Sequence, residues 1–81
     1  MGKKSLTRDE AFLVKLRELA EVKGDKFQEI GRYVVGQAIG QNNRSVDNIV
    51  RMLAQTNFIK KGEGDTIYLT NNGCFLISSL E

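Results

Sequence analysis

Four side chains with hydrogen-bonding groups recur at intervals of three and four residues within a segment that we expect to be helical. They are Arg44, Asp47, Asn48 and Arg51. Residues three and four apart share one face of a helix, so these side chains would lie together. Arginine pairs with guanine and asparagine with adenine in the major groove of a DNA duplex. The spacing therefore favours contact between this helix face and base edges.

The same four residues also fit a solvated helix surface without a ligand. Asp47 could pair with Arg51 at four residues and with Arg44 at three, and such pairs are common on exposed helices. In the first interpretation the two arginines contact DNA, and in the second they pair with Asp47. The sequence leaves both open.

An apolar stripe lies on the other side of this predicted helix. It consists of Val46, Ile49, Val50 and Leu53. The centres of the apolar and polar sets are two residues apart, which at about 100° per residue separates the two faces by roughly 200°. One face would therefore pack in a core while the other stays free to enter a groove.

Two further candidates flank the polar face. Asn43 would lie in the first turn of the helix, where free amides and the helix dipole favour phosphate oxygens, while Asn42 would cap the same helix. Arg32 stands upstream, where it could contact phosphate or could be an ordinary surface arginine. We include Asn43 and Arg32 among the candidate DNA-binding residues.

Lys60 and Lys61 form a third candidate group, on a predicted β-hairpin. Both lysines could reach phosphates. Glu63 and Asp65 follow in the expected turn and would be repelled by phosphate. The contribution of the hairpin to DNA binding is therefore open on the sequence.

These groups need a scaffold, and the hydrophobic periodicity predicts three helices to supply it. The first should run over about residues 8–23, with Thr7 and Glu10 as a capping box. The second should open near Asp25 and end at Gly40, burying Phe27, Ile30, Val34 and Ala38. The third should run from about residue 42 to residue 57.

The period changes after the third helix. Residues 58–61, a turn rich in glycine, and residues 66–70 have the pattern of a two-stranded hairpin. Ile59, Ile67 and Leu69 should face the core. A short final helix should follow, capped by Thr70, with Phe75, Leu76 and Leu80 packing back.

The segment from Arg32 to Arg51 resembles a helix-turn-helix motif. Gly36 occupies the small-residue position of the first helix, and Gly40 the turn position. Val35 and Ile39 precede these glycines, and Val46 and Ile49 follow in the second helix. Gln41 departs from the pattern, because an aliphatic residue is commoner there.

The hairpin that follows is similar to the wing of winged-helix regulators. The next segment, Leu69-Thr70-Asn71-Asn72-Gly73, is similar to the Leu-Thr-x-x-Gly segment that follows the wing in MarR- and PadR-like regulators. The resemblance covers about residues 8–80. It implies a mostly α-helical α+β fold, the winged helix-turn-helix, with three helices, a two-stranded wing and a short C-terminal helix. It also implies a transcription regulator that binds double-stranded DNA.

The composition excludes several classes of site. The chain has 81 residues, no histidine and one cysteine, Cys74, so it offers neither a zinc finger nor a Cys–His catalytic pair. We find no motif for an enzyme or a cofactor, and no apolar stretch long enough for a membrane span. We expect one domain over residues 1–81, a flexible arm at residues 1–6, and a cytoplasmic location.

The net charge of +2 is low for a DNA-binding protein. It leaves open an alternative in which the same fold is a protein–protein adaptor that does not bind DNA. Phe75, Leu76 and Ile77 are consecutive and cannot all face one core, so a homodimer through the C-terminal helix is a further possibility.

Overall fold

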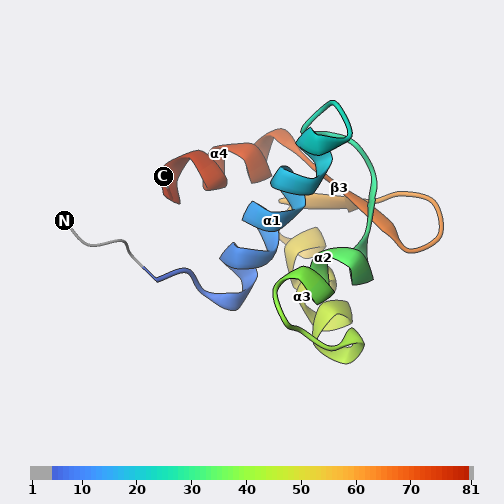
Figure 1. Cartoon of the computed structure of the whole chain (residues 1–81). Coiled ribbons are helices and arrows are strands. Elements are labelled where there is room, and N and C mark those ends of the chain that lie inside the picture. Colours follow the sequence, from blue (N-terminus) through green and yellow to red (C-terminus); the bar gives the residue numbers. More distant parts are fainter. Residues whose placement is uncertain (1–4, 81) are drawn as a thin grey trace.

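A computed structural model describes residues 5–80 (Figure 1). The predicted flexible arm at residues 1–6 lies mostly outside this range. The described residues form an α+β structure that is mostly helical, with four helices and a three-stranded antiparallel sheet. The elements follow in the order α1 (Arg8–Val22), β1 (Ile30–Gly31), α2 (Arg32–Ala38), α3 (Asn43–Gln55), β2 (Ile59–Lys61), β3 (Thr66–Leu69) and α4 (Asn71–Leu80).

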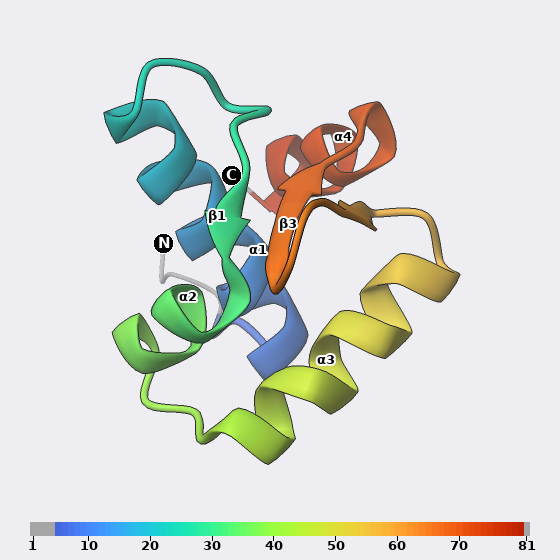
Figure 2. The ribbon, with the colours of Figure 1, turned by 90° about the vertical axis from the view of Figure 1, so that its right-hand side faces the viewer.

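Helix α1 lies at the centre and contacts the other three helices as well as β1 and β3. Its capping box is confirmed, because the Thr7 hydroxyl accepts from the Glu10 amide and the Glu10 carboxylate accepts from the Thr7 amide. Phe12, Leu13 and Leu16 are fully buried along its inner side. Around α1, helices α2 and α3 lie at one end of the molecule and α4 at the other, as both views show (Figures 1 and 2).

The prediction that the second helix opens near Asp25 is wrong. The Asp25 carboxylate accepts a hydrogen bond from the Phe27 amide at 2.7 Å, which closes a turn in place of a helix. The chain then runs as strand β1, where Ile30 pairs with Ile67 and Gly31 with Thr66 (Figure 2). Helix α2 begins only at Arg32.

This strand makes the sheet three-stranded, not two-stranded as the sequence suggested, in the order β1-β3-β2. It also changes what is buried. Phe27 and Val34, expected in the apolar stripe, are 39% and 56% exposed, and Ala38 is also exposed. Ile30 is buried, as expected, and Val35 takes the buried position on α2 that was expected for Val34.

Helix α3 forms as expected, with Asn42 as its N-cap and its four apolar residues buried. The Asn42 side chain accepts from the Ser45 amide at 2.8 Å. The helix ends in a Schellman motif, in which the Asn57 amide donates to Ala54 and the Phe58 amide to Leu53. Asn57 has a φ of +67°, which this motif requires at that position.

The junction between α2 and α3 confirms the two glycine positions. Gly40 has a φ of +78° in the turn. Gly36 is buried, and a Cβ atom at this position would overlap Cγ2 of Val46. The helices therefore meet at a distance that only a residue without a side chain allows.

The hairpin and the final helix also form. Ile59, Ile67 and Leu69 are buried, as predicted. The Thr70 hydroxyl accepts from the Gly73 amide at 3.1 Å and caps α4. The expectation that Phe75 packs back is wrong, because Phe75 is 74% exposed and Ile77 takes the buried position.

Candidate nucleic-acid interface

The exposed side of α3 carries four long polar side chains along one line. Because Arg44, Asn48, Arg51 and Gln55 are three or four residues apart and all exposed, we name them the α3 face. The sequence interpretation stopped at Arg51 and missed Gln55, which continues the same spacing by one more turn. Met52 flanks this face and is 48% exposed.

The two arginines of the α3 face are available to a ligand. Neither Arg44 nor Arg51 forms an ion pair with any residue between positions 5 and 80. The alternative in which Asp47 neutralises both arginines is therefore not what the structure contains. Guanidinium groups without a protein acceptor can donate to phosphates and base edges.

Asp47 is instead bound from α2. Its Oδ1 accepts a hydrogen bond from the Tyr33 hydroxyl at 2.7 Å and lies 3.6 Å from a terminal nitrogen of Arg32. We call Arg32, Tyr33 and Asp47 the α2–α3 tie. The hydrogen bond to Asp47, followed by burial, raises the pKa of the Tyr33 hydroxyl above its ordinary value, so Tyr33 remains a neutral donor.

Arg32 is a structural residue in this arrangement. Its side chain is only 14% exposed, and its Nε donates to the backbone oxygen of Asp65 at 3.0 Å. The Arg32 amide donates to the same oxygen, also at 3.0 Å. Arg32 thus connects α2, α3 and the hairpin turn, and the structure places it with Asp47 rather than on the α3 face.

We expect Arg32→Ala to lower the free energy of unfolding by about 1–3 kcal/mol, since it leaves the Asp47 carboxylate and the Asp65 carbonyl without a charged donor. Arg44→Ala is the matched control and should change stability by less than about 0.5 kcal/mol, because Arg44 is exposed. Urea denaturation followed by circular dichroism measures both. Equal effects of the two substitutions would contradict the structural role of Arg32.

The two lysines of the hairpin face opposite sides of the sheet. Lys60 is the cross-strand partner of Tyr68 and lines a shallow pocket with Asn57 and the first residues of α4. Lys61 pairs with Ile67, so it shares the side of the sheet that carries the buried residues. Only Lys61 is therefore directed to the side on which α1 and α3 pack.

The hairpin turn itself is acidic. Glu63 and Asp65 are exposed there, and the Glu29 carboxylate accepts from the Thr66 hydroxyl at 2.8 Å. Three carboxylates around one turn oppose the approach of phosphate. The described residues nevertheless contain no group of three side chains suited to hold a metal ion.

Asn43 is exposed in the first turn of α3, next to the cap. Its position agrees with the sequence interpretation, and the Asn42 side chain is occupied by the Ser45 amide. Of the eight candidate residues, the structure brings Arg44, Asn48 and Arg51 together on the α3 face. Asn43 lies on the same helix, about 100° around it from Arg44, and Arg32 and Asp47 form the α2–α3 tie. Lys60 and Lys61 lie on β2.

Comparisons with protein-family models, with curated proteins and with solved structures gave no significant match to this chain. No helix within residues 5–80 is both long enough and apolar enough to cross a membrane.

Proposed function

We propose that this chain is a winged-helix protein that binds double-stranded DNA, with α3 in the major groove and the β2–β3 hairpin as its wing. The observation that carries the proposal is the α3 face, where two arginines alternate with two amide side chains and have no acidic partner among residues 5–80. Such side chains donate to guanine, pair with adenine and contact phosphate. In a regulator of this kind, α2 would cross the backbone beside the groove.

The order and packing of the elements support the winged-helix part of the proposal. Helices α2 and α3 are joined by a short turn with Gly40 at positive φ, and they touch at Gly36. A hairpin follows α3 directly, and the extra strand β1 joins its β3 edge. The order helix, strand, helix, helix, strand, strand is compatible with a winged helix.

The proposal assigns distinct roles to the candidate residues. Arg44 and Asn48 read bases, because they lie towards the N-terminal end of α3, which usually meets base edges. Arg51 and Lys61 contact phosphate. Arg32 and Asp47 position α3 and do not contact DNA. A cytoplasmic transcription regulator without catalytic activity is the biological role that we infer from this binding mode.

Titration of a fluorescent duplex against the full chain tests the proposal. Three cations, Arg44 in the groove and Arg51 and Lys61 at the phosphates, would displace counterions from the duplex, so the observed association constant should fall with salt at a log–log slope of roughly −2 to −4. Binding should appear at low salt and micromolar duplex, and should weaken as salt rises. An absence of binding under these conditions would overturn the proposal.

An absence of duplex binding would favour the alternative in which the chain is a protein–protein adaptor, and two surface features support that alternative. The acidic hairpin turn and the exposed Met52 offer mixed polar and apolar contacts that suit a protein partner better than a phosphate backbone. The salt-dependent titration separates the two candidates.

A further inference from the structure

Helix α4 presents a surface that nothing in the described chain covers. Phe75 is 74% exposed at its centre, while Ile77 on the opposite side is buried. None of the ten residues of α4 is charged, although charged residues make up 27% of the chain. An exposed aromatic ring on an uncharged helix is typical of an interaction surface.

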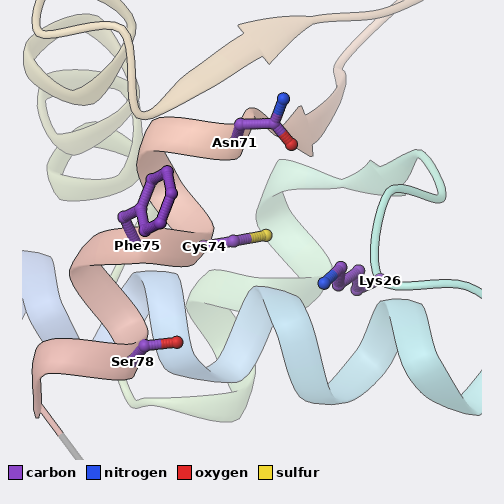
Figure 3. A pocket seen from close by; sticks show the side chains of 5 residues that line it. All are labelled: Lys26, Asn71, Cys74, Phe75 and Ser78. Atoms are coloured by element: carbon purple, nitrogen blue, oxygen red, sulfur yellow. The ribbon is translucent and has the colours of Figure 1, made fainter.

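A pocket lies beside this ring. It has a volume of about 320 Å³ and is lined by Lys26, Asn71, Cys74, Phe75 and Ser78 (Figure 3). Asn71, Cys74 and Ser78 project from α4 towards the side where Lys26 lies, and Phe75 stands at the edge. A cavity of about 150 Å³ already accommodates benzene, so this pocket has room for an aromatic side chain.

We propose that a second copy of this chain docks on α4 about a twofold axis, and that Phe75 of each copy enters the pocket of the other. A twofold interface requires a surface that is complementary to itself, which a ring and a pocket on the same helix provide. The Lys26 ammonium group, which lies 5.5 Å from the centre of the Phe27 ring of its own chain, and the Cys74 sulfur are both favourable neighbours for a further aromatic ring. Two uncharged helices also meet without electrostatic repulsion.

The size of α4 predicts a weak dimer. A helix of ten residues is about 15 Å long, so the contact would bury less than the ~1,200 Å² of a stable interface. We therefore expect a dissociation constant in the range from about 10 μM to about 1 mM. Because α4 and α3 lie at opposite ends of the molecule, this pairing leaves the α3 face open (Figures 1 and 2).

Sedimentation equilibrium of the full chain without DNA, over about 10 μM to 1 mM, tests the dimer. Phe75→Lys should weaken association at least about tenfold, since the new ammonium group would face Lys26 of the second copy. Phe75→Ala should weaken it as well, by removal of the ring. The sharpest test is the double variant Phe75→Lys with Lys26→Glu, in which opposite charges meet and association should recover most of the loss.

Val34→Glu is the matched control, because Val34 is an apolar residue 56% exposed on α2, away from α4. It should leave association unchanged. Thermal melts by circular dichroism establish that each variant is folded. A chain that remains monomeric up to about 1 mM would overturn the proposal. So would association that is equally strong in Phe75→Lys, or a double variant no better than Phe75→Lys alone. Because these measurements contain no DNA, their result does not depend on whether the chain binds duplex.

Discussion

Replacement of both Arg44 and Arg51 by alanine is expected to weaken duplex binding by about 30- to 1,000-fold at low salt. An arginine that contacts a guanine contributes about 1–3 kcal/mol, and a phosphate contact contributes about 1 kcal/mol, so the two losses sum to about 2–4 kcal/mol. Both residues are exposed and have no acidic partner among residues 5–80, so the fold should persist. Fluorescence anisotropy with labelled duplex measures the affinities.

The single variants separate the reading of bases from the contact with phosphate. Arg44→Ala should lose more affinity on a selected specific site than on random duplex. Arg51→Ala should weaken binding to both duplexes equally and reduce the magnitude of the salt slope by about one. Because Asp47 is already bound by Arg32 and Tyr33, removal of either arginine does not release its charge towards DNA.

Lys23→Ala is the matched control for loss of a positive charge. Lys23 is exposed and is the C-cap of α1. This end of α1 lies away from α3 in both views (Figures 1 and 2). Its removal should change affinity far less than the loss of either arginine. If the double variant binds duplex as tightly as the natural chain, the α3 face is not the DNA surface.

The sequence predicted α3 well because local and tertiary signals agree there. The cap at Asn42, the spacing of the apolar stripe and the polar opposite face all indicate the same helix. The same periodicity extends to Gln55, so that residue of the α3 face was available from the sequence as well.

The start of α2 could not be predicted because its determinants are distant in the chain. The side chains of Phe27, Ile30 and Val34 have helical spacing, yet the backbone at Ile30 and Gly31 pairs with β3 more than thirty residues away. Pairing across such a separation leaves no local pattern. The Asp25 turn, by contrast, was visible as an aspartate that can bind the amide two residues on.

The partners of Asp47 could not be predicted from the sequence for the same reason. Sequence spacing offered Arg44 and Arg51 on the same helix, whereas the structure supplies Arg32 and Tyr33 from α2. Such a pair depends on the angle between two helices, and the spacing of residues within one helix gives no information about that angle. Two of the eight candidate residues, Arg32 and Asp47, therefore bind each other across the α2–α3 junction.

Leu53 holds the other end of α3, and Leu53→Ala should have a large effect on stability. Its side chain is 3% exposed in the core, and its carbonyl oxygen accepts from the Phe58 amide at 2.9 Å, where the chain turns into the hairpin. Truncation of a buried leucine leaves a cavity and costs about 2–5 kcal/mol. A chain of this size has a total stability of roughly 4–12 kcal/mol, so the loss is a substantial part of it.

The neighbouring residue gives a control on the same helix. Met52 is 48% exposed, and Met52→Ala should change the free energy of unfolding by less than about 1 kcal/mol. Urea denaturation of both variants, followed by circular dichroism, makes the comparison. A change of less than about 0.5 kcal/mol for Leu53→Ala would contradict its place in the core. Leu53→Ala leaves the side chains of the α3 face unchanged and lowers only the fraction of folded molecules. Under conditions where this variant is fully folded, it should therefore bind duplex with the affinity of the natural chain.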